Sequence, residues 1–247
     1  MSFLDHLEAL RSAIMHSLFF LIGACALAWP ISARLQEFII RHVTSGPGNI
    51  EFIAGEALGP LSARLKVMLA AAIILAAPAI LIRLWMFVGP GLLRKEKKIV
   101  IPAIAVSVAL FYAGFILSFL YLGPSIPGIL LGFSTESVKN VIGINNVMSL
   151  VLTLSLSCGL VGEVPLVIVF LAWAGIVTPG ALLRQWRIAI VVILIVAAVI
   201  TPGDYGITML LVALPIVGLY LISILLAWFV TRKRKRPAVA LGPSEDE

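Results

Sequence analysis

The chain has 247 residues, of which 61% are hydrophobic and only 12% are charged, and its mean hydropathy is +1.13. A soluble domain is about half apolar, so this composition excludes a water-soluble protein and indicates that lipid is the solvent. The formal charge of +6 does not indicate a nucleic-acid partner, because the basic residues stand at the ends of apolar runs.

The apolar runs are continuous, which predicts helices and not a β-barrel. Backbone groups in hydrocarbon must be hydrogen-bonded internally, and barrel strands would alternate over about ten residues. Because a bilayer core of about 30 Å needs roughly 20 apolar residues as helix, we predict an all-α polytopic membrane protein with six transmembrane helices. The expected spans are residues 15–33, 67–89, 99–122, 147–178, 188–200 and 207–230.

Two features of these spans and their connections are unusual. The fifth span rises only about 20 Å, so it either thins the bilayer locally or is sheltered by its neighbours. Long loops follow the first and third spans, and the first is rich in helix formers at Leu35–His42 and Ala57–Lys66. We therefore expect short helices that cap this face of the molecule.

The basic residues also predict the orientation. With six spans, 12 of the 18 Lys and Arg residues fall on the side of the N-terminus and 5 on the other side. Positive charge marks the cytoplasmic side, so both termini are expected to be cytoplasmic. We assign residues 1–231 to one six-helix transmembrane domain, and residues 232–247 to a basic, then acidic, tail that is expected to be disordered.

Glu163 is a carboxylate inside the long fourth apolar run, flanked by Gly159, Gly162 and Pro165, where a kink is expected. An ionised acid near mid-membrane costs at least about 3 kcal/mol. One interpretation is a polar pocket or a docking point for a partner. The other is a neutral glutamic acid that is hydrogen-bonded to a neighbouring helix.

Three further charged groups have simple local interpretations. Glu96 lies in the run Arg94-Lys95-Glu96-Lys97-Lys98 and could accept a guanidinium in bidentate geometry, but the net positive charge of the run favours local pairing. Glu8 and Arg11 are three residues apart and are expected to pair for about 0.3 kcal/mol. Asp204, in the turn before the sixth span, could cap that helix.

No catalytic constellation is present in the sequence. The three histidines are scattered, and no metal-binding histidine motif, nucleophile elbow or phosphate-binding glycine loop occurs. Cys25 and Cys158 both lie in apolar segments, where a disulfide or a metal cage is not expected. We therefore predict neither an enzyme nor a cofactor or metal site.

Several motifs, in order along the chain, resemble the TatC family, the multi-span subunit of the twin-arginine protein translocase. They cover nearly the whole chain and share the predicted six-span topology. The motifs are His6-Leu7-Glu8-Ala9-Leu10-Arg11, Gly55-Glu56-Ala57 with Lys66, Ala77-Pro78 with Trp85, Phe87, Pro90-Gly91-Leu92 and Glu96, Gly159 with Gly162-Glu163-Val164-Pro165, and Thr201-Pro202 with Asp204 and Ala213-x-Pro215.

The resemblance implies a receptor in a bacterial-type inner membrane that binds twin-arginine signal peptides of folded precursors at its cytoplasmic face. It also implies a multimeric complex with single-span TatA and TatB partners and transport driven by the protonmotive force. Glu96 would contact the signal arginines, with Glu8, Arg11, Phe87 and Arg94 on the same surface. A second group, Glu163, Asp204 and Thr208, would form the polar intramembrane and partner-docking positions.

This sequence departs from the family pattern at several positions. The N-terminal glutamate of the family falls on Ala9, with Glu8 one residue earlier and about 100° around the helix. Arg83 replaces a common glutamine, and Thr208 and Leu221 stand where other polar residues are expected. A proton-coupled solute transporter that uses Glu163 is the alternative function, although the two halves of the chain lack the internal repeat typical of such transporters.

Overall fold

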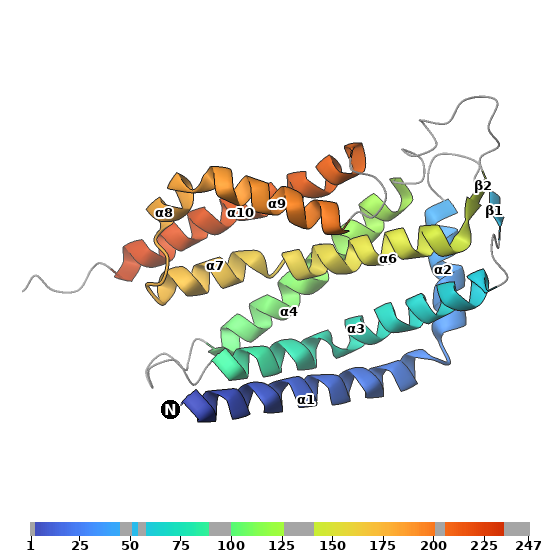
Figure 1. Cartoon of the computed structure of the whole chain (residues 1–247), viewed down its shortest axis with the longest axis horizontal. Coiled ribbons are helices and arrows are strands. Elements are labelled where there is room, and N and C mark those ends of the chain that lie inside the picture. The colour runs from blue at the N-terminus through green and yellow to red at the C-terminus, as the bar shows by residue number, and fades with distance from the viewer. Residues whose placement is uncertain are drawn as a thin grey trace, which may run out of the picture.

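The computed structural model describes residues 3–44, 51–53, 58–88, 100–125, 141–200 and 206–234. Nearly all of these residues are helical, and the long helices lie side by side in an elongated bundle (Figure 1). The helices are α1 (Phe3–Ala28), α2 (Ser32–Thr44), α3 (Gly59–Val88), α4 (Val100–Leu117), the π-helix η3 (Ser118–Leu122), α6 (Ile144–Val161), α7 (Val164–Trp173), α8 (Pro179–Arg184), α9 (Trp186–Ile200) and α10 (Ile207–Arg234).

The prediction of six spans in an all-α protein is confirmed. Within the described residues, five helical segments are long and apolar enough to cross a membrane, and the fourth of them is α6 together with α7. The shorter apolar helix α9, of 15 residues, is the sixth segment and is short as predicted. Helix α10 runs to Arg234, so it extends three residues into the expected tail.

The bundle has two ends (Figure 1). The cap end carries α2, the starts of α3 and α6, and two three-residue strands, β1 (Glu51–Ile53) and β2 (Val141–Gly143), which pair in parallel. The N-terminal end carries the start of α1, the end of α3, the start of α4, and α8.

One of the two predicted capping helices is correct and the other is wrong. Helix α2 covers the expected segment Leu35–His42 and runs across the cap end. The expected helix at Ala57–Lys66 is instead the first part of α3, which begins at Gly59 with Pro60 in its first turn. The helix continues past Lys66 to Val88, and Lys66 Nζ donates hydrogen bonds to Asn145 Oδ1 (2.8 Å) and Ser149 Oγ (2.6 Å) of α6.

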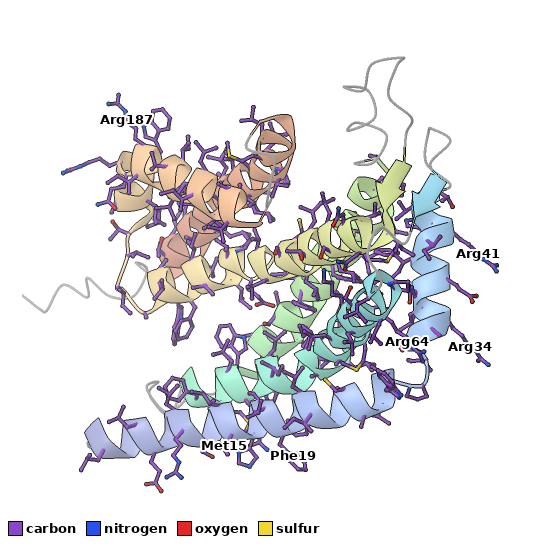
Figure 2. The ribbon with its side chains drawn as sticks, turned by 45° about the vertical axis from the view of Figure 1, so that its right-hand side comes forward. Met15, Phe19, Arg34, Arg41, Arg64 and Arg187 are labelled. Carbon is purple, nitrogen blue, oxygen red and sulfur yellow. The ribbon has the colours of Figure 1, made fainter. Side chains whose placement is uncertain are left out.

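A second cation joins the elements of the cap end. Arg64 donates from Nε to Ser32 Oγ at 3.0 Å, and its guanidinium lies 5.0 Å from the centre of the Trp29 ring. By contrast, Arg34 and Arg41 of α2 point away from the bundle (Figure 2). Arg64 therefore fixes the corner between α1, α2 and α3.

Helix α1 packs on α3 through small side chains and is otherwise open. Their common core consists of four buried alanines, Ala24, Ala28, Ala72 and Ala76, and small residues let membrane helices approach closely. On the side of α1 away from α3, Met15 is 56% and Phe19 is 75% exposed (Figure 2). This side of α1 is therefore free to face lipid.

Helices α4 and α6 cross at contact distance between their backbones. A Cβ atom on Gly114 would lie 2.5 Å from the Cys158 carbonyl oxygen, and a Cβ on Gly162 would lie 2.7 Å from the Leu110 carbonyl oxygen. Neither position has room for a methyl group. Glycine at both positions is therefore what permits this crossing.

The fourth span breaks directly after this crossing, as the sequence predicted. Gly162 donates its N–H to Cys158 O (3.0 Å), but Glu163 donates to Leu160 O (3.1 Å), one residue short of the helical pattern. Pro165 has no N–H to offer the next carbonyl, so the helical ladder cannot continue across this point. A new helix, α7, starts at Val164.

Replacement of Gly114 by alanine should destabilise the protein. Because the new methyl group would overlap a backbone carbonyl and not a movable side chain, we expect a loss of about 1–3 kcal/mol in unfolding free energy. Thermal unfolding of the purified protein in detergent, followed by intrinsic fluorescence, measures this loss. The matched control is Gly23→Ala, because nothing lies within 4 Å of its Cβ position; equal melting temperatures for the two variants would refute the close crossing.

Candidate functional site

Glu163 lies at the break between α6 and α7 and is only 9% exposed. Its Oε2 accepts a hydrogen bond of 2.6 Å from Ser107 Oγ of α4, and Ser107 is completely buried. The carboxyl group is therefore held from a neighbouring helix and lies inside the bundle, away from the surrounding lipid.

The α4–α6 crossing explains how Ser107 reaches Glu163. Gly114 lies seven residues, or about two turns, after Ser107 on the same face of α4. Leu110, between them, approaches Gly162 through its carbonyl oxygen. One face of α4 thus makes the close backbone contact and also delivers the hydroxyl group to the residue that follows Gly162.

The second carboxyl oxygen of Glu163 has no hydrogen-bond partner among the described residues. Its Oε1 is buried, and no group in the described part of the chain hydrogen-bonds to it. Leaving a buried polar atom unsatisfied costs about 1–3 kcal/mol. The carboxyl group therefore has the interhelical hydrogen bond expected of a structural residue, together with one oxygen that is available to a further polar group.

Glu163 lies nearer to the N-terminal end of the bundle than to the cap end. Ser149, which binds Lys66 at the cap end, precedes Glu163 by 14 residues, or about 21 Å along the helix. Ser107 lies only seven residues after Val100, the first residue of α4, or about 10 Å. Only the ten residues of α7 follow Glu163 in this span, so it is nearer to the N-terminal end, and its depth in the bilayer stays a prediction from the sequence.

The residues predicted at the N-terminal end are only partly described. Glu8 and Arg11 are exposed on the first turns of α1, and Phe87 is half-buried in the last turn of α3. Their helices pack against each other, so these residues lie at the same end of the bundle (Figure 1). Glu96, Arg94 and Asp204 lie outside the described residues, as does the side chain of Thr208 in α10.

The predicted pairing of Glu8 with Arg11 is wrong. Both side chains are exposed, and no ion pair joins them in the described part of the chain. An exposed pair gains little in water and must fix two long side chains. Both charged groups are therefore free to meet other molecules.

Ser107 is the functional residue that the sequence analysis missed. A serine in an apolar span can bond to a carbonyl of its own helix, as Ser223 of α10 does with Leu219 O. The sequence does not distinguish that use from a contact with another helix. The signal that could have helped is the seven-residue spacing to Gly114, because a small residue marks the face that packs closely.

An apolar groove lies beside the site. It has a volume of about 600 Å³, is open on one side, and is lined by α4, η3, the end of α6 and residues 214–222 of α10. Gly114 and Gly162 form part of its wall, and Leu214 and Pro215 form the opposite side. Elsewhere in the described residues, no three His, Cys, Asp or Glu side chains come together as a metal site would require.

Comparisons with known proteins agree on one family. Residues 5–215 match the family model for Sec-independent protein translocase protein (TatC). The chain is 34% identical over 246 residues to Sec-independent protein translocase protein TatCy of Bacillus subtilis (strain 168), covering 97% of this chain and 94% of that protein. It is 31% identical over 240 residues to the TatC protein of Koribacter versatilis, covering 96% and 88% of the two chains.

A solved structure has the same fold. The crystal structure of a twin arginine translocase receptor, TatC, superposes on this chain with a TM-score of 0.84 at 29% sequence identity. The superposition covers 92% of this chain and 100% of the other. The similarity thus extends over the whole helical bundle.

Replacement of Ser107 by alanine should destabilise the bundle, because it leaves both oxygens of a buried carboxyl group without a donor. We expect a loss of about 1 kcal/mol or more in unfolding free energy, measured by thermal unfolding in detergent. The matched control is Ser223→Ala, which removes an equally buried hydroxyl that bonds only to its own helix. If both variants melt at the same temperature, the Ser107–Glu163 hydrogen bond adds no more to the unfolding free energy than a hydrogen bond within one helix.

Proposed function

Because the chain belongs to the TatC family of Sec-independent protein translocase subunits, we propose that it binds the twin-arginine signal peptides of folded precursor proteins. The family consists of translocase subunits and not of enzymes, as expected from the sequence. The related crystal structure is of a receptor, and we extend that role to this chain. Recognition then takes place at the N-terminal end of the bundle.

The observation that carries this proposal is the antiparallel packing of α1 on α3. It brings Glu8 and Arg11, both exposed, to the same end as Phe87. In the sequence, Glu96 lies between Val88, the last residue of α3, and Val100, the first residue of α4. Both of these residues lie at the N-terminal end of the bundle. A carboxylate there suits a guanidinium, because the two planar groups form paired hydrogen bonds.

The basic residues support an orientation in which the N-terminal end is cytoplasmic. Of the 18 Lys and Arg residues in the sequence, 12 fall on this side of the spans and 5 on the cap side. Positive residues favour the cytoplasmic side. We therefore infer a multi-pass protein of the bacterial inner membrane with both termini in the cytoplasm, where signal peptides of folded precursors are first met.

We infer further that the intramembrane surface near Glu163 assembles with single-span partners of the TatA and TatB type, for export driven by the protonmotive force. The free Oε1 of Glu163 offers an acceptor to a polar side chain of a partner. The groove beside Gly162 is lined in part by α10. This helix starts three residues after Asp204 in the sequence and includes Thr208. A multimeric complex follows from such docking.

The peptide-recognition step is tested by cross-linking in membranes. A twin-arginine signal peptide with a photo-reactive group should cross-link to the protein, and the same peptide with paired lysines should not. Lysine keeps the charge but cannot form the paired bonds of a guanidinium. Equal cross-linking of the two peptides would sink the proposal, and Glu96→Gln should lower the twin-arginine signal towards that of the lysine peptide.

The role of Glu163 is separable from peptide recognition. Glu163→Ala should leave cross-linking to the signal peptide largely intact, because the residue lies about 10 Å inside the bundle from the start of α4. It should reduce the amount of TatA-like or TatB-like partner that co-purifies with the protein. Glu37→Ala, at the exposed cap end, is the control; normal assembly with lost peptide binding would contradict this assignment.

A further inference from the structure

Helix α3 carries three half-buried cations, Arg64, Lys66 and Arg83, and two of them donate hydrogen bonds to other described residues. Arg64 donates to Ser32 and lies over Trp29. Lys66 donates to two side chains of α6. In the described part of the chain, no group accepts a hydrogen bond from Arg83 and no carboxylate pairs with it; its one contact of note is with the Phe20 ring, 6.0 Å from the guanidinium carbon.

Arg83 lies within the apolar part of the helix pair. It follows Lys66 by 17 residues, which places it about 25 Å along α3 from the cap end. Phe20, beside it, lies nine residues after Arg11, or about 14 Å from the first turns of α1. A half-buried cation at this depth requires an anion or a strong acceptor nearby.

The carboxylates whose side chains are described cannot serve. Glu37 is on α2 at the cap end, and Glu8 is twelve residues before Phe20 on α1, or about 18 Å away along the helix. Glu163 has a similar depth but lies on the other side of α3, as the next contact shows.

Trp85 separates Arg83 from Glu163. The Trp85 ring is buried and meets the Phe170 ring of α7 edge to face, with 5.4 Å between the centroids. Trp85 is two residues after Arg83, or about 200° around the helix. Arg83 therefore faces α1 while Trp85 faces α7, and the intramembrane acid and base do not neutralise each other.

A partner for Arg83 must supply anionic oxygen atoms that accept hydrogen bonds at the N-terminal end of the bundle. A guanidinium that lies over an aromatic ring keeps the N–H groups at its own edge free to donate hydrogen bonds. The apolar side chains around it, Leu84 and Met86 on α3 and Phe20 on α1, are partly exposed, so hydrocarbon chains can lie against them. Basic groups between helices on the cytoplasmic side of a membrane bind anionic lipid head groups.

We propose that Arg83 binds the phosphate of an anionic phospholipid, seated between α1 and α3 in the leaflet at the N-terminal end. The arginine reaches the phosphate by extending its side chain towards the head groups and by drawing the head group inwards. This lipid site is distinct in function from the proposed peptide recognition at Glu96 and from the proposed docking surface near Glu163.

The test uses the full-length protein, mixed in detergent with phosphatidylglycerol or phosphatidylcholine, and native mass spectrometry to count the retained lipids. The wild-type protein should retain phosphatidylglycerol in preference to phosphatidylcholine, and Arg83→Gln should lower that retention about fivefold. Arg83→Lys should keep most of it. Arg187→Gln removes the same charge from an exposed residue at the same end and should leave retention near the wild-type level.

Three outcomes would overturn the proposal. The first is equal retention by Arg83→Gln and the wild-type protein, and the second is an equal loss in Arg83→Gln and Arg187→Gln, which would show only general attraction. The third is unchanged lipid retention with weaker co-purification of a single-span partner, which would assign Arg83 to a carboxylate of that partner. A melting temperature for each variant confirms that the compared proteins are folded.

Discussion

The backbone contact between α4 and α6 is the constraint on which the intramembrane site depends. Gly114 and Gly162 admit no side chain, so the two helices are locked in one register. That register presents Ser107 to Glu163 at 2.6 Å. The break that follows at Pro165 then turns α7 towards α10, its main packing partner. A change of one helical residue at the crossing would therefore remove the donor from the acid and redirect the second half of the fourth span.

In lipid, the presence or absence of a hydrogen-bond partner for a polar side chain indicates whether another molecule binds there. Water would satisfy any exposed group, but hydrocarbon satisfies none, so the protein must supply partners or bind other molecules. Lys66 and Arg64 are examples of groups satisfied internally, and they hold the cap end together. Glu163 Oε1 and Arg83 lack partners in the described part of the chain. These two groups therefore mark surfaces where other molecules are expected.

The sequence predicted the parts of this fold that depend on composition alone. Span number, the short α9 and the break beside Glu163 follow from apolar length and from proline chemistry. It did not predict that residues 59–66 are the first turns of α3, since that depends on the contact of Lys66 with α6. The role of Ser107 was not predicted for the same reason, because the hydrogen-bond partner of a hydroxyl in an apolar run depends on which helix it faces. The resemblance to a family supplied roles for Glu96 and Asp204 that no pattern of the residues contained.

Arg83 and Glu163 show how two polar groups towards one end of the bundle can act independently. Both lie towards the N-terminal end, yet the Trp85–Phe170 contact fills the space between α3 and α7. Two opposite charges in hydrocarbon attract strongly when nothing intervenes, and a direct pair would have left neither group available. Because packed aromatic rings keep them apart, each retains unused hydrogen-bonding capacity. Arg83, on the side of α3 that faces α1, therefore offers donors, and Glu163, at the α6–α7 break beside α4, offers an acceptor. The bundle thus carries two polar positions of opposite chemical character.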